Sequence, residues 1–340
     1  MGDYKMENKI ITNSNVLITG GAGFIGSNLV DKLLKQNNKV VVLDNFSTGK
    51  KENIQHNFNK TNFKLIEGDI RNYNDCRKAV KGVDYVLHQA ALGSVPRSIE
   101  DPMTSTDVNI GGFVKMLFAA KEAKVKRFVY AASSSTYGDS EILPKIEHKI
   151  GKPLSPYAIT KYVDELYAKN FYDIYGIETI GLRYFNVFGK RQDPNGAYAA
   201  VIPKFVIQLM KYESPVINGD GTYSRDFTYI DNVIQANQLA ALVSYDKIKS
   251  VDKESASVFN VAYGQRTDLN ELSKILKENL AKFDPKIADI EIIHGKNRAG
   301  DIPHSLADIE KSKNILGYNP EYDIRKGLKE ACKWYWENLK

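Results

Sequence analysis

The stretch VLITGGAGFIGS, residues 16–27, decides the fold of this chain. A short aliphatic run leads into a glycine-rich turn, and an amphipathic segment follows it. The pattern G-x-G-x-x-G extends from Gly21 to Gly26, with Gly20 in front. Such glycines let the backbone turn sharply and approach a pyrophosphate, whose charge then lies at the N-terminus of the next helix. The stretch therefore predicts a strand, a phosphate-binding loop and a helix.

An acidic residue at the end of the next predicted strand supports a dinucleotide ligand. Asp44 closes the run VVVLD (40–44), 18 residues after Gly26. A carboxylate at this place accepts hydrogen bonds from the ribose hydroxyls of adenosine. A 2′-phosphate would meet the same negative charge, although Lys50 and Lys51 nearby would soften the repulsion. The pattern favours NAD over NADP.

Short apolar runs alternate with helical segments through the first half of the chain. The runs are VLIT (16–19), VVVLD (40–44), FKLIEG (63–68), YVLHQAA (85–91), RFVYAAS (127–133) and TIGLRYF (179–185), and the helical segments are 24–37, 74–81, 106–122 and 157–175. Runs that are apolar on both faces, with crossover helices between them, are typical of a parallel sheet covered on both sides. We predict an α/β fold with a doubly wound, Rossmann-type parallel sheet.

The regular alternation of apolar runs and helical segments ends after residue 186. Loops rich in Gly, Pro and Asn (189–198 and 218–226), a helix from Pro203 and two Lys/Glu-rich helices near 268–282 and 324–338 predict a smaller α/β lobe that binds the substrate. The runs 226–230 and 257–263 have the pattern of buried strands, and we expect both to return to the first sheet. The predicted domains are 15–186 with 226–263, and 187–225 with 264–340, after a flexible N-terminus, 1–14.

Composition narrows the class of protein. The 340 residues are 43% hydrophobic and 26% charged, and no long apolar run suggests a membrane span. The net charge is +6, but the basic residues form no run that would follow a nucleic-acid backbone. Cys76 and Cys332 suggest neither a disulfide nor a zinc site, the histidines lack metal-binding spacing, and the N-terminus lacks the apolar core of a secretory signal. We expect a cytoplasmic protein without a metal ion, a membrane partner or a nucleic-acid partner.

Tyr157 and Lys161 form the pattern Y-x-x-x-K on a predicted helix that begins near Ser155, so their side chains share one face, one turn apart. A neighbouring ammonium favours the phenolate form of tyrosine, which can exchange a proton with a sugar hydroxyl. Alone, such a pair is typical of any helix surface. Here it follows Ser133 by 24 residues, at the sheet edge where open α/β sheets bind ligands. The three residues are candidates for catalysis.

In order and spacing, the motifs of this chain resemble the extended short-chain dehydrogenase/reductase family and, within it, the UDP-hexose 4-epimerases. The motifs are TGGAGFIGS (19–27), LDNFSTG (43–49), GDI (68–70), HQAA (88–91), SSSTYG (133–138), SPYAITK (155–161), LRYFNVFG (182–189), SRDFTYIDN (224–232) and RAGDIPHS (298–305). SVPRSI (94–99) and NGAYAAVIP (195–203) are similar to the branch that acts on UDP-N-acetylhexosamines in bacterial surface-polysaccharide biosynthesis.

The resemblance implies the residues of each site. Tyr157 would be the base, Lys161 the partner that promotes its ionisation, and Ser133 a hydrogen-bonding relay. The implied cofactor-binding residues are Gly20, Gly23, Phe24, Ile25, Gly26, Asp44, Asn45, Ser47, Thr48, Gly49, Asp69, Ile70, Gln89, Ala90, Ala91, Asn109, Ser133, Tyr157, Lys161 and Phe185. The implied substrate-binding residues are Gly93, Ser94, Ser133, Ser134, Ser135, Tyr157, Asn186, Gln192, Ala200, Asn218, Arg225, Arg298, Asp301 and Ser305.

The activity that the resemblance implies is the interconversion of UDP-N-acetylglucosamine and UDP-N-acetylgalactosamine. Tyr157 would remove the proton of the C4 hydroxyl while a hydride passes from C4 to tightly bound NAD, and the transient 4-keto sugar would be reduced again on its other face. Small residues at Ser305, Ala200 and Gly93 would leave room for an N-acetyl group, with UDP-glucose and UDP-galactose as weaker substrates. The resemblance also implies a homodimer formed through the tyrosine-bearing helix and the one before it.

Other functions stay open at this point. A UDP-uronic acid 4-epimerase, acting on UDP-GlcNAcA or UDP-GlcA, would use Arg97 and Arg191 to pair the substrate carboxylate. Dehydratases and decarboxylases of the family carry carboxylates directly after the relay, where this chain has Ser134, Ser135 and Thr136. A non-catalytic dinucleotide sensor would have no use for the intact catalytic set.

Overall fold

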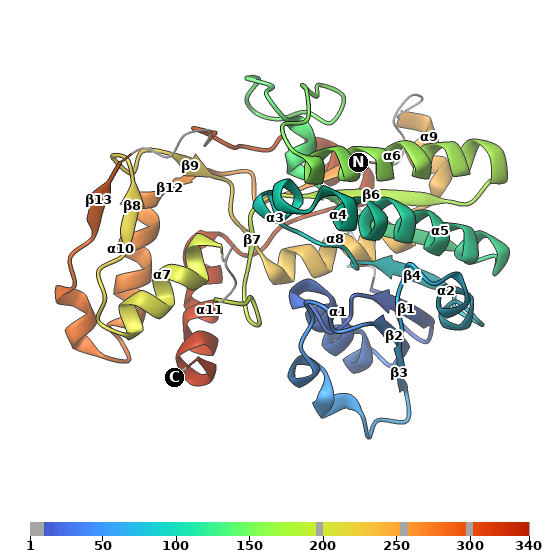
Figure 1. Cartoon of the computed structure of the whole chain (residues 1–340), viewed down its shortest axis with the longest axis horizontal. Coiled ribbons are helices and arrows are strands. Elements are labelled where there is room, and N and C mark those ends of the chain that lie inside the picture. The colour runs from blue at the N-terminus through green and yellow to red at the C-terminus, as the bar shows by residue number, and fades with distance from the viewer. Residues whose placement is uncertain (1–9, 195–199, 252–257, 297–301, 340) are drawn as a thin grey trace, which may run out of the picture.

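A seven-stranded parallel sheet forms the centre of the computed structural model, which describes residues 10–194, 200–251, 258–296 and 302–339 (Figure 1). Its strand order is β11-β6-β5-β4-β1-β2-β3. The strands are β1 (Asn15–Thr19), β2 (Lys39–Asp44), β3 (Phe63–Glu67), β4 (Tyr85–His88), β5 (Arg127–Ser133), β6 (Thr179–Tyr184) and β11 (Val258–Val261). Because β1 pairs with both β2 and β4, the order of the chain switches at β1, and the doubly wound α/β fold is confirmed.

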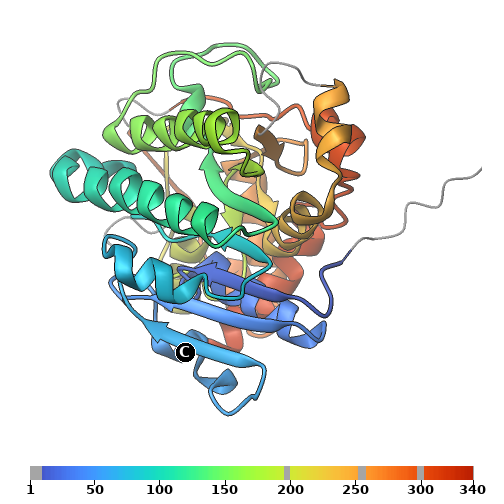
Figure 2. The same cartoon turned by 90° about the vertical axis from the view of Figure 1, so that its right-hand side faces the viewer.

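Helices cover both faces of this sheet (Figure 2). The helices α2 (Tyr73–Ala79), α5 (Phe113–Glu122) and α6 (Pro156–Tyr175) share one face, and α1 (Phe24–Lys35) and α8 (Ile230–Leu242) share the other. Within β1, Leu17 packs against the face covered by α2, α5 and α6, whereas Val16 and Ile18 pack against the face covered by α1 and α8. Successive side chains of a strand point to opposite faces, so apolar residues at every position are what a sheet buried on both sides requires.

Three short helical segments lie between β4 and α5. They are α3 (Val95–Glu100), α4 (Pro102–Thr106) and a π-helical segment η3 (Asp107–Gly112) that continues directly into α5. The helix expected over 106–122 is thus divided between η3 and α5. The helix α3 begins at Ser94, whose Oγ accepts a hydrogen bond from the backbone N of Arg97.

The remaining elements extend to one side of the sheet, where α7, α10 and α11 pack together (Figure 1). They are β7 (Val187–Phe188), α7 (Val201–Met210), β8 (Val216–Asn218), β9 (Ser224–Arg225), β10 (Thr228–Tyr229), β12 (Thr267–Asp268), α10 (Leu269–Leu280), β13 (Ile293–Gly295) and α11 (Ile324–Asn338); α9 (Tyr245–Val251) follows α8 in the chain. The strands pair as β10-β7, β12-β9 and β13-β8. The proposed division into two discontinuous domains stays a prediction.

One strand prediction was wrong. The run 257–263 does return to the first sheet, as β11 beside β6, but the run 226–230 does not. Its residues Thr228 and Tyr229 pair with β7 outside the main sheet, and α8 starts at Ile230. The run is apolar because Tyr229 packs on Phe188, with ring centroids 5.5 Å apart, and burial of this kind looks the same in sequence as burial in a central strand.

No helix in the described ranges combines the length and apolar character needed to cross a bilayer.

Candidate active site

A cavity of about 410 Å³ opens at the carboxyl ends of the central strands, beside the switch point at β1. Every residue predicted to bind the cofactor lines it, except Asn109 and Phe185. Asn109 is buried behind the wall, where its Oδ1 accepts a hydrogen bond from the backbone N of Leu92 at 2.8 Å. Phe185 is fully buried in a small apolar cluster with Tyr137. The cavity thus brings together residues from six strand ends and the start of α6.

Glycine is required at two positions of the loop that leads from β1 into α1. Gly20 has a φ of +67°, and a Cβ there would lie 2.8 Å from the backbone of Ala90. A Cβ on Gly26 would lie 2.1 Å from the carbonyl oxygen of Gly20. The loop therefore packs tightly on itself and on the end of β4. The first turn of α1 carries no side-chain cap, so its backbone N–H groups remain for an anionic ligand.

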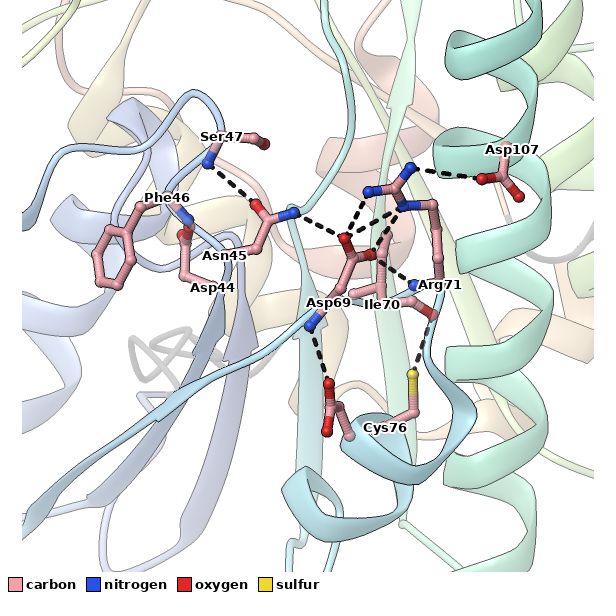
Figure 3. Close-up of polar contacts among 10 residues, drawn as sticks. Asp44, Asn45, Phe46, Ser47, Asp69, Ile70, Arg71, Cys76 and Asp107 are labelled. Carbon is pink, nitrogen blue, oxygen red and sulfur yellow. Dashed lines mark hydrogen bonds and ion pairs between the residues drawn. The ribbon is translucent and has the colours of Figure 1, made fainter.

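Asp44 ends β2 and holds the loop that follows it (Figure 3). Its Oδ2 accepts a hydrogen bond from the backbone N of Ala22 and its Oδ1 one from that of Phe46, both at 2.8 Å. Burial raises the pKa of this carboxyl, and the two amide hydrogen bonds work against that rise. Each carboxylate oxygen can accept more than one hydrogen bond, so Asp44 can still receive ribose hydroxyls.

Asp69, just after the neighbouring strand β3, also lines the cavity and is held by Arg71 (Figure 3). Arg71 Nη2 lies 2.7 Å from Asp69 Oδ2, Asn45 Nδ2 donates to the same oxygen at 2.9 Å, and Arg71 also reaches Asp107 of η3 at 3.5 Å. The hydrogen bond from Arg71 lowers the pKa of Asp69 to about 2, so this carboxylate is ionised at neutral pH. Arg71 was not predicted, although it stands two residues after Asp69.

The three candidate catalytic residues line the same cavity, at the end of β5 and the start of α6. Ser155 caps α6 by accepting a hydrogen bond from the backbone N of Ala158, which places half-buried Tyr157 in the first turn. Lys161 is buried, and its Nζ donates to the carbonyl oxygen of Ala131 at 3.0 Å. The Oγ of Ser133 accepts hydrogen bonds from the backbone N and the Oγ of Ser135.

A second tyrosine in this cavity, Tyr184 of β6, was not predicted. Its hydroxyl donates to Gln89 Oε1 at 3.2 Å and accepts from Asn237 Nδ2 at 2.9 Å. Burial raises the pKa of Tyr184 to about 12, with both hydrogen bonds acting in the opposite direction. Its hydroxyl therefore keeps its proton at neutral pH and is no candidate for the base.

A second cavity, of about 500 Å³, adjoins the first, and Val187 lines both. It lies between β7, α7, β8 and β9, and five residues predicted to bind the substrate line it: Asn186, Gln192, Ala200, Asn218 and Arg225. Lys204 and Tyr223 also line it and were not predicted. The other lining residues are apolar, and the described wall contains no Asp or Glu. The cavity suits a ligand that carries negative charge on one part and apolar faces on another.

The other predicted substrate residues lie outside the second cavity. Gly93 lines the first cavity, and Ser94 caps α3 behind it. Ser134 and Ser135 begin the short helical turn η4 (Ser134–Tyr137) after β5. Ser305 is half-exposed, and its backbone N donates to the carbonyl oxygen of Ser224, the residue before Arg225. Arg298 and Asp301 lie outside the described residues.

A cavity shaped for a dinucleotide, with a tyrosine and a lysine on its wall, is also what a comparison of the sequence with known protein families leads us to expect. The model of the family described as "NAD dependent epimerase/dehydratase family" matches residues 16–262. The chain belongs to this family. Its matched part includes all seven strands of the central sheet, apart from Asn15, and every catalytic candidate. Because the family is NAD dependent, NAD is the cofactor of this epimerase/dehydratase.

Solved structures of UDP-sugar epimerases are similar to this family member along almost its whole length. A UDP-N-acetylglucosamine 4-epimerase from Methanobrevibacter ruminantium, in complex with UDP-N-acetylmuramic acid, is 40% identical, with a TM-score of 0.87 and coverage of 96% of this chain and 99% of that one. A UDP-glucose 4-epimerase from Thermotoga maritima, with UDP-glucose, is 35% identical (TM-score 0.85; coverage 96% and 100%). A UDP-glucuronic acid 4-epimerase from Bacillus cereus, with UDP-glucuronic acid and NAD, is 29% identical (TM-score 0.82; coverage 95% and 99%).

The residues of this epimerase/dehydratase fit NAD. The tight glycine loop leaves room for a pyrophosphate, and Asp44 and Asp69 place two carboxylates on the cavity wall, at the ends of neighbouring strands, where ribose and adenine would bind. Among the described residues, no group of three His, Cys, Asp or Glu side chains is arranged to hold a metal ion.

Proposed function

We propose that this protein is a 4-epimerase that interconverts UDP-N-acetylglucosamine and UDP-N-acetylgalactosamine. One observation carries the proposal: the cavity that holds Ser133, Tyr157 and Lys161 adjoins a second cavity lined by Arg225 and Lys204. A diphosphate in the second cavity would meet these cations, and arginine binds such groups through two parallel hydrogen bonds. A sugar attached to that diphosphate would then reach the catalytic residues.

The chain's own residues supply proton transfer and orientation. NAD held in the first cavity would supply the reversible hydride transfer at C4 of the sugar. Tyr157 removes the proton of the C4 hydroxyl and later gives it back. Because the hydride is returned to C4 as well, no net oxidation results. The charge of Lys161, one helical turn away, favours the phenolate that can accept this proton. Ser133 fixes the hydroxyl by hydrogen bonding, and the apolar walls of the second cavity exclude water.

The residues around the relay favour an epimerase over a dehydratase or a decarboxylase. Elimination of water or loss of a carboxyl group requires further acid and base groups beside the sugar. The turn after Ser133 carries Ser134, Ser135 and Thr136, with no carboxylate. The acids that line the first cavity are Asp44 and Asp69, both at its adenosine end. The chemistry should therefore stop at epimerisation.

NMR of the purified protein with UDP-N-acetylglucosamine, without added NAD, tests the function. We expect signals of UDP-N-acetylgalactosamine to appear and to reach a constant ratio, because the retained cofactor is regenerated in each cycle. A ketone or a decarboxylated product would contradict epimerisation. If only UDP-glucose or a UDP-uronic acid reacts, the 4-epimerase assignment stands and the N-acetylhexosamine assignment is lost.

Ser305 offers a test of the substrate preference. Its backbone N donates to the carbonyl oxygen of Ser224, the residue before Arg225 of the second cavity, and the expected role of its small side chain is to leave room for an N-acetyl group. We expect Ser305→Tyr to lower kcat/KM for UDP-N-acetylglucosamine about tenfold more than for UDP-glucose, since a steric clash with the bound N-acetyl group would cost about 1–3 kcal/mol. The two kcat/KM values, measured in parallel, decide this. Equal losses would show that Ser305 has no part in selecting the C2 substituent.

The position of Arg191 weakens the alternative that the substrate is a UDP-uronic acid. Arg191, one of the two arginines considered for its carboxylate, instead pairs with Asp31 of α1 at 2.6 Å and donates to the carbonyl oxygen of Ser27. Its side chain is largely buried in this contact. Arg97, in α3, remains as the arginine that such a substrate would use.

The homodimer stays a prediction, and the exposed face of α6 supports it. Ile159, Leu166 and Ile174 are each about half exposed or more, and their spacing places them along one stripe of the helix. Exposed apolar stripes of this kind mark contact surfaces. We include a symmetric pairing of two copies along α6 in the proposal, and sedimentation of the purified protein measures it.

A further inference from the structure

Asp164 lies one turn beyond Lys161 on α6 and has no part in the mechanism above. Its side chain is 1% exposed, and its Oδ2 lies 3.3 Å from Lys161 Nζ. Its Oδ1 has no hydrogen-bond partner among the described residues. Buried carboxylates normally have their hydrogen-bonding positions filled, because an unmet one costs free energy. Because burying this carboxylate costs free energy, we expect Asp164 to have a role other than packing.

Asp164 helps to fix the orientation of the Lys161 ammonium group. An ammonium group has three N–H donors and no acceptor. Lys161 uses one donor on the carbonyl oxygen of Ala131 and a second on Asp164 Oδ2. Because Lys161 also lines the first cavity, these two contacts leave one donor for a ligand bound there.

Asp164 also balances the charge of Lys161. The lysine side chain is 4% exposed, and a buried ammonium without a counter-charge readily gives up its proton. The next acid on the helix, Glu165, is bound to Arg183 at 2.7 Å and so compensates another charge. Asp164 is the carboxylate in contact with Lys161 in the described structure.

The groups that face this pair from neighbouring strands are uncharged. Burial, aided by the nearby charge of Lys161, lowers the pKa of His88 in β4 to about 3, so the imidazole is neutral. Burial raises the pKa of Tyr130 in β5 well above its usual range, so the phenol keeps its proton. Burial raises the pKa of Asp164 to about 7; the charge and hydrogen bond of Lys161 act against that rise, and the charge of Glu165 adds to it. Apart from Glu165, the charge state of each member of the pair therefore depends on the other.

We propose that Asp164 is a positioning residue: its contact with Lys161 Nζ holds the lysine charge in place and directs the remaining N–H of Lys161 into the cavity, where it supports Tyr157 as the base. The inference rests on the proposed function, in which the Tyr157 phenolate is the base. Asp164 itself acts only through Lys161, since it lines neither cavity.

Magnitudes decide the direction of the effect. Lys161 is one turn from Tyr157, about 6 Å away, and Asp164 is two turns away, about 10 Å. Because Coulombic interaction weakens with distance, losing the nearer lysine charge should raise the pH at which Tyr157 ionises by more than losing the aspartate charge lowers it. If Asp164 keeps Lys161 charged, its removal brings both effects, and the net change is upward.

The ionisation of Tyr157 can be followed without turnover. NMR of the holoenzyme, with tyrosine labelled at the ring ζ carbon and without substrate, gives the titration of each tyrosine, and a Tyr157→Phe sample assigns the relevant signal. We expect Asp164→Asn to move the titration of Tyr157 upward in pH. A downward shift would mean that Asp164 opposes Lys161, and no shift would mean that it only fills space. Either result overturns the proposal.

Two further variants separate this role from stability. Glu165→Gln removes an adjacent buried acid that pairs with Arg183, so it should leave the titration of Tyr157 unchanged. In a Lys161→Met background, Asp164→Asn should add no upward shift, and an upward shift there would contradict the proposal. If Asp164→Asn alone does not fold, the double variant should fold better, because it leaves no unpaired buried charge. A double variant that folds no better would count against the pairing. Since none of these readouts uses turnover, failure of the epimerase assay would leave them interpretable.

Discussion

Tyr157→Phe should abolish epimerisation, lowering kcat by about a thousandfold, while NAD stays bound. The substitution removes the hydroxyl that takes the proton from C4, and positioned acid–base groups contribute about 10²–10⁴ to a rate. It retains the ring, and the contact from the backbone N of residue 157 to Ser98 Oγ does not depend on the hydroxyl. The rate is measured by the NMR assay, and the cofactor by the NAD released on denaturation.

Tyr162→Phe is the matched control for this experiment. Tyr162 is a half-buried tyrosine on the same helix, five residues on, and points in another direction. It should keep nearly full activity. If Tyr157→Phe retained a tenth of the wild-type rate or more, Tyr157 would not be the base, and Ser133 would be the next residue to test.

Gly26→Ala should yield a protein that lacks NAD and unfolds at a lower temperature. The added Cβ would lie 2.1 Å from the carbonyl oxygen of Gly20 and 2.8 Å from Gly21 Cα. Backbone atoms cannot give way without opening the phosphate loop, so we expect the loss of about 2–4 kcal/mol of stability and of most bound cofactor. The bound NAD per protein and the thermal unfolding midpoint are the two measurements.

Gly111→Ala is the corresponding control. A Cβ there would meet the tips of two flexible side chains, Asp107 at 3.3 Å and Lys115 at 3.8 Å. These can move, and alanine is favoured over glycine in a helical segment. Full NAD content in both variants would refute the role assigned to the loop, and loss in both would mean that the protein tolerates no change in this part of the fold.

The main sheet could be predicted from the sequence because each strand is a continuous apolar run between turn residues. The expected runs at 16–19 and 127–133 match β1 and β5 closely. The short helices α3 and α4 were missed because six or five residues carry too little periodicity to be recognised. The pairing of β10 with β7 was missed because it depends on which buried surface the segment meets.

Those parts of the candidate site that lie within one sequence motif could be predicted. Those parts that depend on contacts between segments far apart in the chain could not. The phosphate loop and the Tyr157/Lys161 pair are local patterns, and the structure gathers them in one cavity. Arg191 was expected near the substrate, yet it pairs with Asp31, 160 residues away in the chain. Lys204 was missed although it follows Ala200 by one helical turn, a spacing that places both on the same side of α7.

The pairing of β11 with β6 has a consequence for how the protein is made. β6 is buried along its whole length, but its outer neighbour β11 begins at Val258, 74 residues after β6 ends at Tyr184. During synthesis the growing chain must therefore carry β6 as an apolar, unpaired edge until most of the protein has emerged. Such edges template wrong pairing between chains, and long-range parallel pairing is slow. Products that stop before Val258 would keep that edge open permanently, so aggregation is the expected fate of unfinished chains.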